Sequence, residues 1–368
     1  MAGGKSSVRI QSLDGLRALS ILLVFLGHLK GTRAFPSQLD ALGQFAELGV
    51  RVFFVISGYL ITTLLFEDLR KIEAGTLTRG EALKQFYIRR AYRIFPAAYV
   101  LLLVVWILDA AGVITLAPHD LICGATYTQN FHLASERSWW LGHLWSLSVE
   151  EQFYLLWPAA LLLLGRRRGM WVALGALAFA PAARFAMYFG MPAYRDGVGE
   201  WFPTIFDTIA AGCLLAGVRA WLHARPGYLR ALQSPLFLVL PVAIFGAALL
   251  ESKPLLDYGP GQLVQNLAIA VLIDRSITWP STLWGRALNV RPLIFIGQLS
   301  YSLYLWQQLF INRHSDSWVS AFPVNLGLAF ATACVSYYLV EQPVLRFRAR
   351  RAAKLRVHGA EGPVAATP

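Results

Sequence analysis

The chain has 368 residues, of which 56% are hydrophobic and only 15% charged, whereas ordinary soluble domains contain about 25% charged residues. This composition excludes a soluble globular protein and indicates a multi-pass membrane protein, surrounded by membrane lipid. A net charge of +12 would favour a nucleic-acid partner in a soluble protein. Here the basic residues lie in short loops between apolar runs, so we expect no nucleic acid.

Ten apolar stretches are long enough to form helices that cross a bilayer, which requires about 20 residues. They begin near residues 14, 48, 94, 148, 171, 203, 234, 261, 293 and 322. The stretch 119–133 is short and polar, and we interpret it as a re-entrant or outer-face helix. The sequence therefore predicts an all-α polytopic transmembrane helix bundle of about ten spans over residues 1–348, followed by a basic, disordered cytoplasmic tail over 349–368.

The distribution of Lys and Arg predicts the orientation of this bundle. With both termini in the cytoplasm, 25 of the 33 basic residues fall in cytoplasmic segments, six fall in outer segments, and two lie within spans. Cytoplasmic loops of membrane proteins carry such an excess of positive charge. We therefore expect a multi-pass protein of the inner (cytoplasmic) membrane with both termini on the cytoplasmic side.

The first span carries an arginine and a histidine, in the motif "LDGLRALSILLVFLGH". Arg17 and His28 are eleven residues apart, which is close to three helical turns, so they share one face and differ in depth by roughly 16 Å. Ionisable groups inside a bilayer are costly and are usually functional. The simpler alternative is an arginine that reaches the headgroups and a histidine bonded to a backbone carbonyl.

The third span begins with three arginines, in the motif "FYIRRAYRIFP". Guanidinium groups bind phosphate oxygens well, so Arg89, Arg90 and Arg93 are candidate phosphate ligands at the cytoplasmic mouth. The excess of positive charge on cytoplasmic segments would by itself also account for them.

The fourth span begins at its outer end with two adjacent carboxylates, in the motif "HLWSLSVEEQFYLLWP". Glu150 and Glu151 point about 100° apart on a helix, so we expect only one of them to face His28. A carboxylate bonded to an imidazole orients the ring and supports its basicity. Alternatively, both acids only interact with the helix dipole.

Two further arginines lie within predicted spans. Arg51 requires a partner there, and Arg184 either binds an anion or pairs with Asp207. The cysteines show no spacing typical of a metal site, and we expect no metal.

Together these motifs resemble those of the acyltransferase-3 family of integral-membrane acyltransferases. "GVRVFFVISGYLI" and "SYSLYLW" complete a set of five that occurs in the family's order over about residues 13–345. The resemblance implies an O-acyltransferase domain of about ten spans. It also implies a cytoplasmic acyl-CoA donor, with acetyl-CoA as the default, and a hydroxyl of a cell-surface or lipid-linked glycan as the acceptor. It further implies polysaccharide-assembly proteins as partners.

The resemblance also assigns residues. His28 matches the motif histidine and Glu150 the glutamate of the Trp-Ser-Leu-x-x-Glu motif, so these two are the expected catalytic residues. Gln307 stands where family members often carry a histidine, and we assign it no proton-handling role. The expected acyl-CoA ligands are Arg17, Arg89, Arg90 and Arg93.

In the expected mechanism, His28, oriented by Glu150, takes the proton from the acceptor hydroxyl after the pantetheine arm has brought the thioester to it. Direct attack and an acyl-histidine intermediate are both open. A sugar or lipid transporter or flippase would also have buried polar residues, and acylation of a small natural-product glycoside is a further alternative. CoA binding distinguishes the acyltransferase from the transporter, because a transporter does not require phosphate-binding arginines at one mouth.

Overall fold

The computed structural model describes residues 10–250 and 253–360, and over these residues the chain is a helical bundle without strands. The longer helices are α1 (Gln11–Leu29), α2 (Ala46–Glu73), α3 (Arg79–Ala110), α6 (Leu144–Gly190), α7 (Phe202–His223), α9 (Val239–Ala248), α11 (Gln262–Thr278), α13 (Arg291–Trp306), α14 (Val324–Ser336) and α15 (Gln342–Ala360).

Short helices lie between them. The α-helical ones are α4 (Asp120–Ala125), α5 (Trp139–Gly142), α8 (Pro226–Gln233), α10 (Pro254–Leu256) and α12 (Leu283–Leu288). The 3₁₀ segments are η1 (Ser37–Phe45), η2 (Gln129–Phe131), η3 (Pro192–Gly197), η4 (Pro235–Leu238), η6 (Gln307–Leu309) and η7 (Trp318–Ser320). Two π-helical segments are η5 (Asp257–Gly261) and η8 (Tyr337–Glu341).

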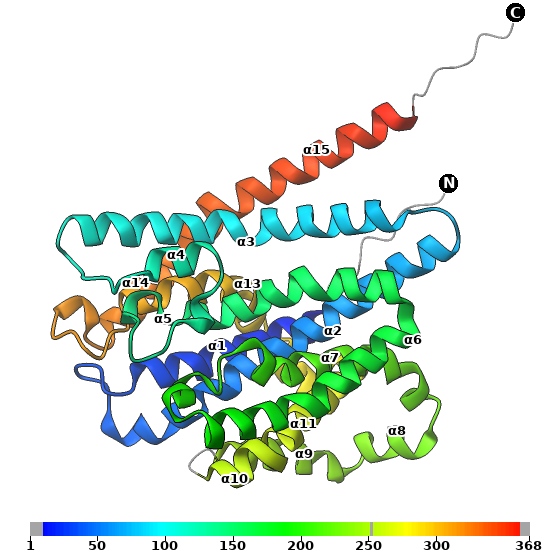
Figure 1. The fold of residues 1–368 in the computed structure, drawn as a ribbon, viewed down its shortest axis with the longest axis horizontal. Helices are drawn as coiled ribbons and strands as arrows, with labels where there is room; N and C mark the ends of the chain where they lie inside the picture. The colour runs from blue at the N-terminus through cyan, green and yellow to red at the C-terminus, as the bar shows by residue number, and fades with distance from the viewer. Residues whose placement is uncertain (1–9, 251–252, 361–368) are drawn as a thin grey trace, which may run out of the picture.

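Three connections gather at one end of the bundle, which is the end that the predicted topology places outside. Figure 1 shows the α1–α2 connection, the segment with α4 and α5, and the α13–α14 connection together at its left. Hydrogen bonds join them: the Phe322 N–H donates to the Arg33 carbonyl (2.9 Å), and Trp139 Nε1 donates to the Ile311 carbonyl (3.0 Å). We call this the outer end, and the opposite end the inner end.

Helix α6 consists of two arms. A straight helix of its 47 residues would be about 70 Å long, more than twice the hydrocarbon thickness of a bilayer. The chain reverses at Gly165, whose φ of 77° favours glycine. Arg137, before α6, forms a two-bond ion pair with Glu200, after it (2.6 and 2.5 Å). Both arms therefore end at the outer end, and the turn lies at the inner end (Figure 1).

The predicted number of ten spans is not confirmed. Within the described ranges six helices are long and apolar enough to cross a membrane, or seven if the bent pair Pro226–Gln233 and Pro235–Ala248 is one span. The number is lower because the two arms of α6 count once, and because α11 and α13 have only 17 and 16 residues, fewer than the usual 20 or so. The stretch 119–133 holds only α4 and η2, which are too short to cross.

Residues 349–360, the first part of the predicted disordered tail, belong to α15. This helix continues through Ala360 and extends away from the bundle (Figure 1). Alanine, arginine and lysine are strong helix formers, which accounts for helix rather than disorder over 349–360. Residues 361–368 lie outside the described residues.

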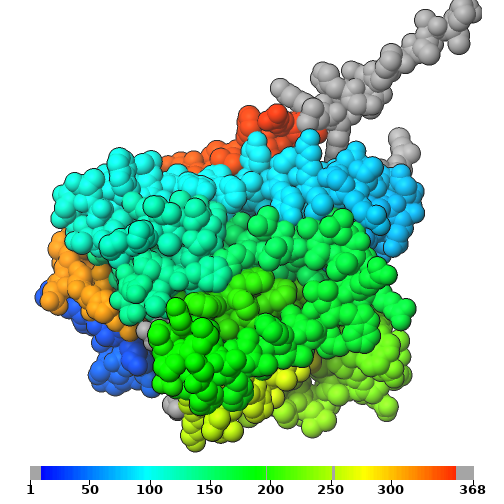
Figure 2. All heavy atoms as spheres, viewed as in Figure 1, coloured from blue at the N-terminus to red at the C-terminus, as the bar shows by residue number. Residues whose placement is uncertain are grey.

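Large apolar side chains cover the outside of the bundle. Figure 2 shows one face that is formed mostly by α3 and α6. On these helices Trp106, Leu155, Leu163 and Trp171 are all more than half exposed. Soluble proteins rarely expose this many large apolar side chains on neighbouring helices. This face is suited to lipid, in agreement with the composition.

Helix α1 lies inside the bundle between α2 and α13, which are the two helices it contacts most. A Cβ atom at Gly297 of α13 would overlap the Asp14 carbonyl of α1, and one at Gly49 of α2 would overlap the Ser20 carbonyl. These glycines allow close helix packing. Close packing fixes the depth of His28, near the end of α1, relative to the residues that follow α13.

Candidate active site

A row of cavities runs from the inner end of the bundle towards the outer end. The inner-mouth cavity is lined by four arginines: Arg89, Arg90, Arg93 and Arg348. Arg90 also lines the next cavity, the middle cavity, together with Arg17 and Glu150. Arg17 and the predicted arginine cluster, which are far apart in the sequence, therefore line neighbouring spaces.

The row continues to the outer loops. Val50 and Tyr304 are shared by the middle cavity and the histidine cavity, which is lined by His28 and His143. The same two histidines line the outer cavity, which has a volume of about 910 Å³ against about 110 Å³ for the middle cavity. We call the four cavities the conduit. Its middle admits only a slender group, whereas its outer part has room for a sugar.

The hydrogen bonds of His28 indicate which of its two ring nitrogens carries the proton. Its Nδ1 lies 3.0 Å from Oε1 of Gln307, and because an amide oxygen only accepts hydrogen bonds, Nδ1 carries the proton. Nε2 of the neutral ring is then the basic nitrogen, and the Gln308 amide approaches it at 3.5 Å. Gln307 is completely buried. Gln307 therefore orients the imidazole of His28, a role that the sequence analysis expected of Glu150.

His143 is a site residue that the sequence analysis missed. Its Nδ1 lies 2.7 Å from Oε1 of Gln308, and its Nε2 lies 3.0 Å from the Leu305 carbonyl. Both ring nitrogens thus have a partner within the protein, and His143 positions Gln308. Its position, two residues before Trp145 of the Trp-Ser-Leu motif, was a usable signal. It was overlooked because only His28 was placed within a span.

Glu150 does not contact His28. Its Oε1 accepts a hydrogen bond from Ser57 (2.6 Å), and it lines the middle cavity with Arg17. The reason is depth: His143 lies at the level of His28, and Glu150 is seven residues, about 10 Å, further along the helix. Of the two adjacent acids, Glu150 is the one that lines this cavity.

The inner arginines differ in their partners. Arg89 lies 3.5 Å from Asp68, and Arg93 lies 3.9 Å from Glu341, whereas the Arg90 guanidinium lies 4.7 Å from the centre of the Tyr154 ring. Arg348, to which the sequence analysis assigned no role, also lines this mouth. The mouth combines four guanidinium groups with few carboxylates, an arrangement suited to a polyanion.

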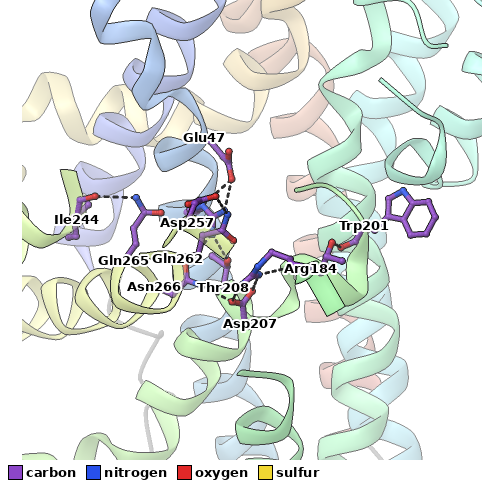
Figure 3. A network of polar contacts seen from close by, with 12 residues as sticks. Glu47, Arg184, Trp201, Asp207, Thr208, Ile244, Asp257, Gln262, Gln265 and Asn266 are labelled. Carbon is purple, nitrogen blue, oxygen red and sulfur yellow. Dashed lines mark hydrogen bonds and ion pairs between the residues drawn. The ribbon is translucent and has the colours of Figure 1, made fainter. Parts of the chain in front are cut away.

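The arginines within the predicted spans belong to a buried polar network. Arg184 pairs with Asp207 through two bonds (3.0 and 2.9 Å), both side chains being fully buried, so pairing and not anion binding is the outcome for Arg184. Arg51 binds Glu47 (2.5 Å) and also donates to Thr208 (3.3 Å). Figure 3 shows how this network reaches from Arg184 to Glu47.

The outer wall of the conduit is formed by Trp139 and the loop after α13. The ring centroids of His28 and Trp139 are 5.6 Å apart, and the Arg313 guanidinium lies 5.0 Å from the Trp139 ring. Arg313 also donates to the Gly27 carbonyl (2.7 Å). Burial lowers the pKa of Arg313, and the charge of Asp40 opposes that shift. This loop thereby holds the end of α1 in place.

The fold and the conduit define a class: a multi-pass helical membrane protein with a histidine between an arginine-lined inner mouth and a roomy outer cavity. The sequence model of a family described as an acyltransferase domain matches residues 10–341. The chain therefore belongs to the acyltransferase-3 family, as the motifs predict.

Curated relatives support this membership. The chain is 29% identical over 375 residues to the peptidoglycan O-acetyltransferase OatA of Listeria monocytogenes, with 91% of this chain and 56% of the relative covered. It is 28% identical over 361 residues to the O-acetyltransferase OatA of Staphylococcus aureus strain NCTC 8325, with 91% and 57% covered. The chain thus spans little more than half the length of these relatives. No solved structure matches it.

Proposed function

We propose that this protein transfers an acyl group, in particular acetyl, from cytoplasmic acyl-CoA to a hydroxyl of a cell-surface or lipid-linked glycan at the outer face of the inner membrane, with both termini in the cytoplasm. The observation that carries the proposal is the conduit, in which arginines and an imidazole lie at opposite ends of one row of cavities. The peptidoglycan acetyltransferase named above supports a glycan as the acceptor class.

The inner mouth would hold the nucleotide end of the donor. Its phosphates are too charged to enter the bilayer, and guanidinium groups bind them with paired hydrogen bonds. Arg90, which lines two cavities, would lie at the point where the pantetheine arm enters the middle cavity. There Ser300 has a buried hydroxyl without a protein partner, and Glu150 is an acceptor. Both suit the amides of that arm.

His28 would act as the general base. Nε2 takes the proton of the acceptor hydroxyl, the oxygen attacks the thioester carbon, and a C–O bond forms as the C–S bond breaks. The imidazolium then returns its proton to the departing thiolate, so atoms and charge balance. Gln307 keeps Nδ1 protonated throughout. Attack by His28 itself, giving an acyl-histidine, uses the same nitrogen.

Replacing Arg90 by alanine is expected to raise the KM for acetyl-CoA about tenfold, because one bond to a charged group is lost. Arg230→Ala, an exposed arginine on α8, is the matched control and should change little. The measurement is transfer of labelled acetyl groups to glycan fractions of the native cell, together with thermal stabilisation of the purified protein by CoA. Absence of any response to CoA in the unmodified protein would favour a transporter instead.

Gln307→Leu is expected to lower kcat about 10- to 100-fold, a common result when the residue that orients a functional histidine is lost. The KM for acetyl-CoA should stay unchanged, since Gln307 lies away from the inner mouth. Gln307→Glu restores an acceptor for Nδ1 and should recover part of the rate. Equal loss in both variants, or a change in KM alone, would show that Gln307 does not orient the base. Gln233→Leu on α8 is the control.

A further inference from the structure

The histidine cavity contains a carboxylate that the proposed chemistry does not use. Glu47, in the first turn of α2, lines this cavity together with His28, and its side chain is one-third exposed. Glu47 is therefore accessible from the space in which an acceptor must lie to reach His28.

Arg51 holds this carboxylate in a fixed position. The Nε and Nη2 atoms of Arg51 donate at 3.1 and 2.5 Å, and both bonds end on Oε1 of Glu47. Oε2 receives neither of them. The Arg51 side chain is nearly fully buried and is itself held by Thr208 and Asn266 (3.3 and 3.5 Å). One oxygen of Glu47 is thus anchored in the network of Figure 3, and Arg51 leaves the other oxygen of this cavity-lining side chain free of its own hydrogen bonds.

The chemistry of the cavity restricts what can bind there. A carboxylate only accepts hydrogen bonds, so its ligand must bring donors and cannot carry a negative charge at that point. Trp145 and Tyr258, which line the same cavity, provide aromatic surfaces with a polar edge. Arg195 and Glu200 also line this cavity, so it carries charges of both signs. A sugar ring combines hydroxyl donors with an apolar C–H face and therefore suits Glu47 and the two aromatic residues.

We propose that Glu47 is a specificity-determining residue that binds a hydroxyl of the acceptor sugar next to the one that His28 deprotonates. The acceptor is then a glycan whose reacting residue has a free hydroxyl next to the one that is acylated. This inference rests on the proposed function and assigns a residue that binds the acceptor.

The test measures acetyl transfer at increasing concentrations of the glycan fraction of the native cell that becomes labelled from acetyl-CoA. Glu47→Gln is expected to raise the apparent KM for that fraction about tenfold, as expected when a hydrogen bond loses its charged partner. The KM for acetyl-CoA and the slow hydrolysis of acetyl-CoA without glycan should stay within about twofold, because neither involves the acceptor. Glu73→Gln, an exposed acid at the other end of α2, is the matched control.

Glu47→Asp is a second variant, which tests whether the effect of Glu47→Gln comes from a folding defect. It keeps a charge for Arg51 but withdraws the carboxylate by one methylene, so the KM for the glycan should rise about threefold in a stable protein. If both variants keep the KM for the glycan while the unmodified protein transfers acetyl groups, Glu47 is only a partner of Arg51 and this inference is wrong. If the unmodified protein labels no glycan fraction, the proposed function itself fails, which is a different result.

Discussion

Replacing His28 by alanine is expected to reduce acetyl transfer by about 10²- to 10⁴-fold, the range typical of a lost general base. His28 lines the conduit, and its Nε2 is the basic nitrogen because Gln307 accepts the hydrogen bond of the opposite one. Transfer is measured with labelled acetyl-CoA and the glycan fractions of the native cell. CoA binding at the inner mouth should survive, because the arginines lie in other cavities.

Two other histidine variants test whether the loss of transfer is specific to His28. His119→Asn changes an exposed histidine of the outer loop that has a φ of 72°, a conformation that asparagine tolerates; transfer should remain normal. His143→Ala should reduce transfer less than His28→Ala, because its ring only holds Gln308. Near-normal transfer by a correctly inserted His28→Ala protein would mean that the conduit uses another base.

The largest effect on stability is expected from Asp207→Asn. The substitution keeps the shape of the side chain but leaves Arg184 with a buried positive charge and no compensating carboxylate, which costs about 3–5 kcal/mol. Asp207 accepts from Arg184 and also from Asn266 (3.2 Å), so the loss affects α6, α7 and α11 together. The free energy of unfolding in mixed detergent micelles is the measurement.

A double variant separates the charge from the packing. Arg184→Met with Asp207→Asn removes both charges, so it should recover much of the lost stability. Lys71→Met removes the exposed partner of Asp68 (2.9 Å). Asp68 keeps Arg89 nearby (3.5 Å), so this variant should cost less than about 1 kcal/mol. If Asp207→Asn costs no more than Lys71→Met, the buried pair does not stabilise the fold.

Much of the site could be predicted from short stretches of sequence. The spacing of Arg17 and His28 places both on one face of α1, and both line the conduit. The family, the helical class and the membrane setting followed from motifs and composition in the same way. These features depend on helical periodicity and hydrophobicity, which are local properties of the chain.

Other parts of the site could not be predicted because they depend on contacts between distant segments. His28 and Gln307 are 279 positions apart, and a family comparison that expected histidine at Gln307 gave that residue no role. Glu150 was expected at the level of His28, but the course of the chain before α6 places His143 there instead. Helical spacing gives the relative depth of residues on one helix and not the register between two helices.

The amino-acid sequence by itself determined which segments are apolar helices, which faces carry charged groups, and which family the motifs match. Only the tertiary structure decided that Gln307 orients the imidazole, that Arg184 pairs with Asp207, and that Glu47 opens into the histidine cavity. The physical reason is the close packing at Gly49 and Gly297. Packing of this kind sets the register between helices, and the register decides which polar side chains meet inside the bundle.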